Sequence, residues 1–507
     1  MSPDVKTPQI PYELRVPAGG MGQPHTPLSL LFWGLGCIML GLAVSYLLVQ
    51  GEFRLLLLVL LSVLGLMSLA PIRGIYILTL FLPFMYFLRR AVLNFQEFSP
   101  RDPILVFPAI TTLAMSVGVI IFYGPRLLHY FRNSALLKVC TFLAGVMVLQ
   151  IFNPLQGSLV VGLAGAMFFI VPMLWLLFGL ILPREDMIRI LKIILVLGCI
   201  TALYGLYQRY FGLSEVEVYE LKSKQFLKTF GSLSDVRVMS TFSGLSDFSR
   251  YLTVSTFIAF AYFWRTKNSV LMVLLVALQF FAMLYTAMRT SFLVTFFSML
   301  MLMIVGGRNA KQVVARGMVA LLVVCVLYSF TYRYDARNVY TSRMSSNPFV
   351  VHTLSGISHP TQESTFQVRL KIWAYVIGST IWPYPVGRGL GSTTVAAKKF
   401  EGGDYYDTDS YFFELFYGSG LAAPILFMIL VVMLLKRLTR LCLDWPDQYV
   451  YKICFGLVCG VLLSSVFGLT LRDNIIGPTA WLIIGWIIKE EIDTRRPMNL
   501  PDQAPSR

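Results

Sequence analysis

Charge is scarce in this chain, because Asp, Glu, Lys and Arg together make up only 13% of its 507 residues while 56% are hydrophobic. A soluble domain carries about 25% charged residues. Whole stretches lack charge, such as the run from Leu159 to Leu182, and runs of about 20 apolar residues match the hydrocarbon core of a bilayer. Composition therefore excludes a string of soluble domains and predicts an all-α, polytopic transmembrane helix bundle.

Paired cysteines are also missing. The seven cysteines lie in apolar runs or at their ends, without CxxC spacing, so we expect small hydrophobic residues rather than disulfides or metal ligands. The net charge of +16 does not indicate nucleic acid as a partner, because Lys and Arg are scattered through short breaks. Much of this excess is expected from topology, since cytoplasmic loops of membrane proteins retain Lys and Arg.

The apolar runs predict about fourteen membrane spans, within a range of twelve to fourteen. These spans are expected at residues 29–50, 54–71, 74–89, 104–124, 138–153, 158–182, 190–207, 251–264, 270–287, 290–306, 316–332, 420–436, 453–470 and 475–488. Basic residues concentrate in alternate breaks, which the positive-inside rule places in the cytoplasm together with both termini. Among the short breaks, one disagrees most clearly with this rule, so either a span is miscounted there or its arginines face an anionic ligand: Arg89, Arg90 and Arg101.

The resulting organisation has seven segments, two of them long loops on the periplasmic side. They are a disordered cytoplasmic tail (1–28), N-terminal transmembrane helices (29–207), a first periplasmic loop (208–250), central transmembrane helices (251–332), a large periplasmic loop (333–419), C-terminal transmembrane helices (420–488) and a cytoplasmic tail (489–507). No cleavable signal peptide is expected, because the first apolar run continues into a full span. The large loop is too long for a connector and is the candidate functional element, with short helices of its own.

The first loop carries Arg237 and ends in a Gly/Ser/Asp-rich turn that leads through Arg250 into a helix. Backbone N–H groups at a helix start, together with arginine, favour an anion. The alternative is a solvated loop whose arginines contact lipid headgroups. Arg289 lies in a short hairpin between two spans. A single arginine in such a hairpin usually extends its guanidinium group to the membrane–water interface.

The large loop contains three further motifs. Residues 367–378 predict an amphipathic helix with Arg369 at its start and Trp373 one turn later. A Pro/Gly segment around Arg388 allows backbone to approach a ligand closely. Asp409 and Tyr411 then precede the next span.

Two patterns in this loop are misleading. The Gly387-Arg-Gly-Leu-Gly391 run follows no βαβ strand, so it does not indicate a dinucleotide cofactor. Asp407-Thr-Asp409 has spacing suited to a divalent metal, but nucleotide sugars are cytosolic and this loop is predicted to be periplasmic. No metal site and no cofactor are therefore expected.

The order of these motifs over residues 200–440 resembles the O-antigen ligase and Wzy-type polysaccharide polymerase superfamily. The resemblance implies an inverting, metal-independent glycosyltransferase of the GT-C type in the bacterial inner membrane, with its active site facing the periplasm. Its donor and acceptor would be glycans on undecaprenyl diphosphate, a chain-length regulator is a candidate partner, and the product would be O-antigen, capsule or exopolysaccharide.

The same resemblance assigns roles to individual residues. Arg237 and Arg369 match the two periplasmic arginines that neutralise the diphosphate leaving group, where preorganised cations favour the charge that develops. Supporting contacts to diphosphate or glycan are expected from further side chains of the same segments: Arg388, Arg289, Arg250, Tyr411 and Trp373.

The chain departs from the family's ligases at one position. Those carry a His-Asn or His-Ser pair where this sequence has Asp409-Ser410, and an Asp can serve as the base. The change favours a chain-lengthening polymerase over a ligase. Asp409 could instead only cap a helix, and His352 or His359, upstream in the loop, could supply the base.

Two alternatives to the polymerase remain open. A ligase would use the same chemistry with a different acceptor. A transporter of lipid-linked glycans without chemistry predicts ionisable residues near the middle of the spans, and the apolar runs contain almost none.

Overall fold

The computed structural model describes residues 63–93, 103–223, 237–266, 270–306, 315, 318, 364–394, 397 and 408–495. Within these ranges the chain is built from helices and turns and contains no strand. Six of the described helices are long and apolar enough to cross a bilayer by length and composition. The prediction of a helical membrane protein is therefore confirmed, while the count of fourteen spans, several of which lie outside the described residues, stays a prediction.

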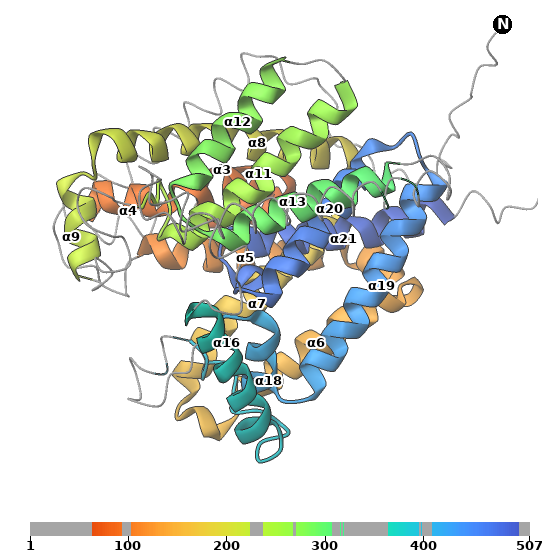
Figure 1. Cartoon of the computed structure of the whole chain (residues 1–507). Coiled ribbons are helices and arrows are strands. Elements are labelled where there is room, and N and C mark those ends of the chain that lie inside the picture. The colour runs from red at the N-terminus through yellow and green to blue at the C-terminus, as the bar shows by residue number, and fades with distance from the viewer. Residues whose placement is uncertain are drawn as a thin grey trace, which may run out of the picture.

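The elements follow one another in this order: α3 (Pro71–Phe81), η2 (Leu82–Phe84), α4 (Met85–Leu93), α5 (Pro103–Asn133), α6 (Ala135–Gln150), η3 (Pro154–Gln156), α7 (Leu159–Ile181), α8 (Arg184–Phe211), α9 (Glu215–Ser223), α11 (Leu245–Thr266), α12 (Val270–Leu284), α13 (Arg289–Val305), α16 (Ser364–Tyr375), the π-helical turn η5 (Val376–Ile381), α18 (Tyr411–Ser419), α19 (Ala422–Asp444), α20 (Tyr449–Val466), η6 (Thr470–Arg472) and α21 (Ile476–Arg495). In Figure 1, α21 lies among α5, α7 and α20, and α16 and α18 form a smaller group below them.

Helix α5 is longer than the predicted span, because it runs to Asn133 and not to residue 124. Apolar side chains such as Leu127 and Tyr130 pack on the core and continue its buried face. The helix after it begins where the Ser134 side chain accepts a hydrogen bond from the backbone N–H of Leu137, which satisfies a helix-start donor. Likewise, the first predicted loop is not irregular throughout, since α8 extends to Phe211 and α9 lies within that loop.

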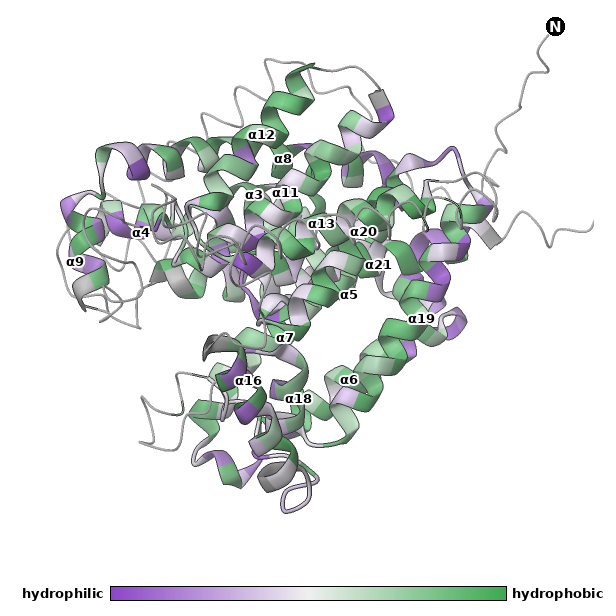
Figure 2. Ribbon diagram, in the orientation of Figure 1, coloured by the Kyte–Doolittle hydropathy of each residue, from purple (hydrophilic) through white to green (hydrophobic). Residues whose placement is uncertain are grey.

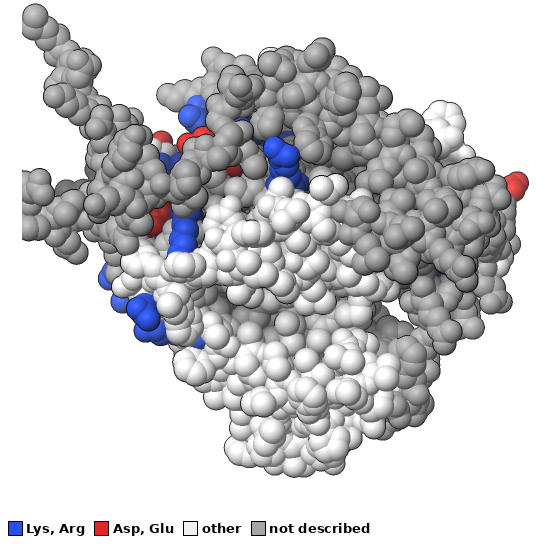
Figure 3. Space-filling model, turned by 180° about the vertical axis from the view of Figure 1, so that it is seen from behind, with Lys and Arg blue, Asp and Glu red and all other residues white. Residues whose placement is uncertain are grey.

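Hydrophobic residues colour most of each long helix in Figure 2, and polar residues gather at helix ends and in the connections. Figure 3 shows the molecule from behind, with most of the visible charged side chains towards the left of the view. The described residues over the middle and lower part of this view are uncharged. An uncharged surface of this kind suits contact with lipid.

Helix α21 separates two polar regions. At its C-terminal end, Glu490 pairs with Arg184 at 2.5 Å and accepts a hydrogen bond from the Tyr451 hydroxyl at 2.7 Å, and Glu491 pairs with Arg437. These residues come from breaks and a tail that the positive-inside rule places on one side. The other end of α21 borders the cavity described below, roughly 20 Å away at 1.5 Å per residue.

Close packing of α7 on α21 requires glycine. A Cβ atom added to Gly179 would lie 2.1 Å from the carbonyl oxygen of Leu482, and one added to Gly485 would lie 2.0 Å from that of Leu176. Small residues of this kind let helix backbones approach within membranes. These contacts hold α21, and with it the cavity end of the bundle, against α7.

The Gly485→Ala variant is expected to lower the free energy of unfolding by about 1–3 kcal/mol, as overpacking does. Gly145→Ala is the matched control, because Gly145 also lies in an apolar helix but has no atom within 4 Å of an added Cβ. Thermal unfolding in detergent compares the two variants. Equal melting temperatures for both would show that α7 and α21 do not pack as described.

Candidate functional site

A cavity of about 390 Å³ lies at the N-terminal end of α21. Its walls come from helices α4, α7 and α16, the starts of α11 and α13, Thr394, the segment before α18, the end of α20 and the break between α20 and α21. Six charged side chains line it, three basic and three acidic: Arg250, Arg369, Arg472, Asp247, Asp409 and Asp473. Segments far apart in the sequence thus bring three guanidinium groups to one opening.

Arg250 is held between two carboxylates. Its Nη1 lies 3.5 Å from Asp247 Oδ1 and 3.3 Å from Asp473 Oδ2. Asp247 is in the first turn of α11, where a negative charge is favoured by the helix dipole, and Arg250 follows one turn later. The geometry fixes the guanidinium group at the cavity wall.

Asp473 is the most buried charged group of the cavity, with a side chain only 3% exposed. Its Oδ1 accepts hydrogen bonds from the backbone N–H groups of Ile475 and Ile476, so it caps the start of α21. Burial and then the nearby charge of Asp247 raise the pKa of Asp473 to about 7, against the lowering effects of Arg250 and of the two backbone hydrogen bonds.

Arg369 and Asp409 form the second polar pair. Arg369 Nε lies 3.3 Å from Asp409 Oδ2, so the structure brings together two of the three predicted catalytic residues. Trp373 anchors α16, because its indole N–H donates to the Thr408 carbonyl oxygen at 3.0 Å and its ring stacks on Phe413. Trp373 itself does not line the cavity among the residues described there.

Asp409 is not the N-cap residue of α18, the alternative role that the sequence leaves open for it. The N-cap of α18 is Ser410, and no side-chain hydrogen bond caps that helix. Asp409 has a φ of 50°, in the left-handed region that is uncommon for residues other than glycine. Its side chain is 50% exposed, so the carboxylate is open to a ligand in the cavity.

Arg472 is a cavity residue that was absent from the predicted site. It lies at the end of η6, and its Nη1 contacts Glu414 Oε1 at 2.5 Å and donates to the Thr393 carbonyl oxygen at 3.1 Å. The Glu414 side chain is fully buried. The sequence did contain a signal, because an arginine in a short break on the predicted periplasmic side opposes the positive-inside rule.

Arg237 and Arg289 lie beside each other but not in the cavity lining. The backbone N–H of Val238 donates to the Tyr285 carbonyl oxygen, which brings the two loops together. Burial and then the like charge of Arg289 lower the pKa of Arg237. The structure therefore places Arg237 outside the cavity that Arg369 lines, and its role in diphosphate binding stays a prediction. Both neighbours of Arg289 in sequence, Met288 and Thr290, line the cavity.

Arg388 and Tyr411 are placed elsewhere. Arg388 stacks over the Tyr384 ring and donates to the Tyr417 hydroxyl at 3.0 Å. Tyr411 is buried between Phe169 and Phe427. Neither lines the cavity, so contact with a ligand there is not what their positions support.

The glycine-rich run around Arg388 approaches the chain's own backbone. Gly387 has a φ of 97°, and an added Cβ would lie 2.5 Å from the backbone nitrogen of Gly420. The backbone N–H of Gly389 donates to the Gly418 carbonyl oxygen at 2.9 Å. Glycine is required here for packing between two turns of the chain.

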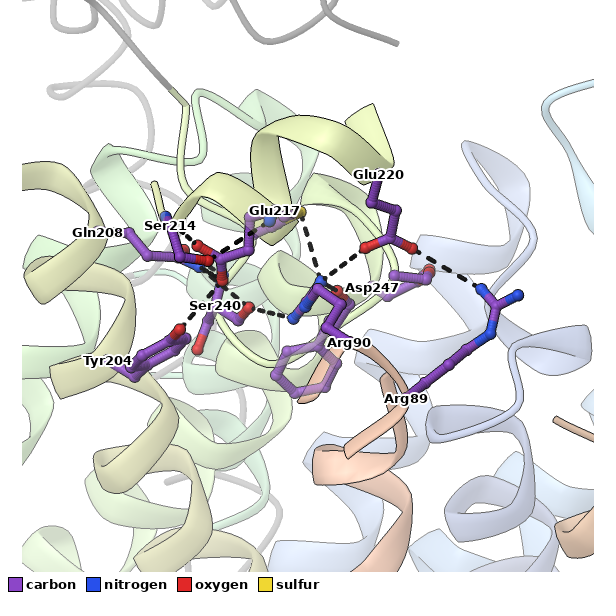
Figure 4. Close-up of polar contacts among 12 residues, drawn as sticks. Arg89, Arg90, Tyr204, Gln208, Ser214, Glu217, Glu220, Ser240 and Asp247 are labelled. Atoms are coloured by element: carbon purple, nitrogen blue, oxygen red, sulfur yellow. Dashed lines mark hydrogen bonds and ion pairs between the residues drawn. The ribbon is translucent and has the colours of Figure 1, made fainter. Parts of the chain in front are cut away.

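Arg89 and Arg90, the two arginines against the charge rule, have protein partners (Figure 4). Both pair with the carboxylate of Glu220 on α9, at 3.8 and 3.3 Å. Arg90 also donates to the carbonyl oxygens of Ser240 and Phe242 at 2.8 and 3.0 Å. Arg90 thus holds the segment that carries Arg237 and leads into α11. Arg101, His352 and His359 lie outside the described residues.

No protein-family model matches this sequence, and no curated protein matches it significantly. Among the described residues, no group of three His, Cys, Asp or Glu side chains is placed to hold a metal ion. Asp407, the first residue of the predicted metal-like pair, lies outside them.

Proposed function

We propose that this chain is a membrane glycosyltransferase that transfers a glycan from undecaprenyl diphosphate to a lipid-linked repeat unit, at the periplasmic face of a bacterial inner membrane. The observation that supports it most is the single cavity lined by Arg250, Arg369 and Arg472, with the Asp409 carboxylate at its edge. All six of its charged side chains belong to segments that the positive-inside rule places outside the cytoplasm.

The charges of the cavity suit a diphosphate leaving group. Breaking the anomeric C–O bond leaves negative charge on the diphosphate, and fixed cations favour that charge more than they favour the uncleaved substrate. Arginine presents a planar fork of donors that matches phosphate oxygens. Each of the three arginines is already oriented by a carboxylate, so little ordering is needed when the substrate enters.

The reaction is a displacement at the anomeric carbon of the donor. The acceptor hydroxyl oxygen forms the new C–O bond as the bond from the anomeric carbon to the diphosphate oxygen breaks, and the electron pair leaves with the diphosphate. Asp409 takes the hydroxyl proton. Its half-exposed carboxylate lines the cavity, so an acceptor hydroxyl bound there would lie within the reach that a general base requires.

Transport without chemistry is supported less well. Ionisable side chains along α21 are confined to its two ends, since none occurs between Asp473 and Lys489. A transport path predicts such groups near the middle of the bilayer. Transfer to an acceptor other than a repeat unit would use the same cavity, so a ligase differs from the polymerase only in the acceptor it binds.

Bacteria that lack this chain are expected to accumulate single repeat units on undecaprenyl diphosphate. Mass spectrometry of the lipid extract identifies the intermediate and its sugars. Restoring the wild-type chain should return the polymer. If the deletion strain keeps polymer of normal length and amount, the proposed polymerase function is wrong.

A further inference from the structure

Every arginine of the cavity already has a carboxylate partner before any substrate enters. Three arginines face three aspartates, and each arginine already contacts a carboxylate, Arg472 through Glu414. An incoming diphosphate must therefore take guanidinium groups away from carboxylates. The cost is smallest where the released carboxylate can be neutralised.

Asp473 is the carboxylate that a proton can neutralise most readily. It is buried, its charge lies close to that of Asp247, and its ion-pair partner is Arg250, at 3.3 Å. Its Oδ1 is committed to the start of α21 whatever its charge, whereas its Oδ2 contacts Arg250. A proton on Oδ2 would free one side of Arg250 without disturbing the cap.

We propose that Asp473 is a positioning residue for anion binding: it holds Arg250 in the empty cavity and takes up one proton from solvent when a diphosphate replaces it as the partner of Arg250. This inference rests on the proposed function for the identity of the ligand. It gives the two cavity carboxylates different tasks, because Asp409 stays available as the base while Asp473 becomes neutral.

The surroundings of Asp473 favour this exchange. Asp247 and Arg250 face it from α11, Tyr86 from α4 and Arg472 from its own break, and Arg369 and Asp409 lie on the further walls. Once Arg250 turns to a phosphate, Asp473 loses its counterion and gains a second negative neighbour. Without a ligand the pKa of Asp473 is already raised to about 7. Both changes raise this pKa further, so Asp473 keeps its proton at neutral pH when the ligand is bound.

The test is the pH dependence of binding by the purified full chain in detergent. The probe is a geranyl diphosphate glucose diester, whose phosphates do not titrate near neutral pH. With one proton taken up, the affinity should fall about tenfold per pH unit above about pH 7 and level off below it. Calorimetry in two buffers of different ionisation enthalpy counts the proton directly.

Asp473→Asn provides the critical comparison, because the amide oxygen can still accept the two N–H groups at the start of α21. Its affinity should not change with pH and should exceed that of the wild type by about tenfold near pH 8. Asp247→Asn, the matched control, should keep the pH slope with its onset at lower pH.

Three outcomes separate the two claims. A slope that Asp473→Asn abolishes supports the proposal. Saturable binding with no slope, or with the same slope in Asp473→Asn, overturns the role of Asp473 and leaves the proposed function standing. Absence of saturable binding by the wild type overturns the diphosphate site, and the proton-coupled exchange with it.

Discussion

Replacement of Arg369 by alanine is expected to slow glycan transfer by about 10²–10³-fold, the usual loss when one preorganised donor to a developing negative charge is removed. Arg369 is also the ion-pair partner of Asp409 at 3.3 Å. The variant therefore loses a diphosphate ligand and the group that orients the base. The rate is measured as polymer formed per unit of protein in membranes that contain equal amounts of each variant.

The control for Arg369→Ala lies on the same helix. Lys371 is basic, exposed and absent from the cavity lining, so Lys371→Ala should leave the rate within about twofold of the wild type, as expected for a surface charge. Arg369→Lys should recover only part of the activity, because lysine keeps the charge but not the fork of donors. Equal loss in Arg369→Ala and Lys371→Ala would contradict the assigned role.

Replacement of Glu414 by alanine is expected to lower the free energy of unfolding by about 3–5 kcal/mol, because removal of one partner leaves the other charge of a buried pair uncompensated. The Glu414 side chain is fully buried and contacts Arg472, whose guanidinium group lies 5.8 Å from the centre of the Phe169 ring. The apparent melting temperature of the purified chain in detergent reports the loss.

A double variant separates stability from chemistry. Glu414→Leu with Arg472→Met replaces the buried pair by apolar side chains, which often restores stability. We expect this double variant to melt near the wild-type temperature but to transfer glycan slowly, because the cavity has lost an arginine. A Glu414→Ala variant as stable as the wild type would show that the ion pair does not fasten α18 to the α20–α21 break.

Properties carried by runs of residues could be predicted from the sequence. The scarcity of charge predicted the helical membrane class, and the amphipathic pattern around Arg369 predicted α16, which the structure describes from Ser364 to Tyr375. The large predicted loop also contained both members of the Arg369–Asp409 pair. Nothing local, however, showed that these two side chains meet, because the contact depends on Trp373 binding the Thr408 carbonyl oxygen.

Properties that depend on partners distant in sequence could not be predicted. The charge rule marks Arg472 as unusual, but its partners Glu414 and Thr393 belong to segments that the sequence does not place beside it. Arg237 was expected beside Arg369, but the hydrogen bond from Val238 to Tyr285 places it near Arg289.

Two sequence patterns that also suit ligand binding have partners within the chain. Gly387 and Gly420 allow close backbone approach, as glycine near a ligand would, but they approach each other. Arg89 and Arg90 opposed the charge rule as ligand-binding arginines would, but the anion they meet is Glu220. A glycine pattern indicates close backbone approach, and an arginine pattern indicates pairing with an anion. Whether the partner is a ligand or another part of the chain depends on the fold.

The most direct test of the cavity as a glycan-transfer site uses the purified chain in liposomes with a single lipid-linked repeat unit as substrate. Mass spectrometry would follow the glycan and the free undecaprenyl diphosphate together. The account predicts elongated lipid-linked glycan with one undecaprenyl diphosphate released per bond formed, and loss of both in Arg250→Ala and Arg369→Ala. Movement of unchanged lipid-linked repeat across the bilayer, with neither elongation nor release, would contradict it and identify a transporter.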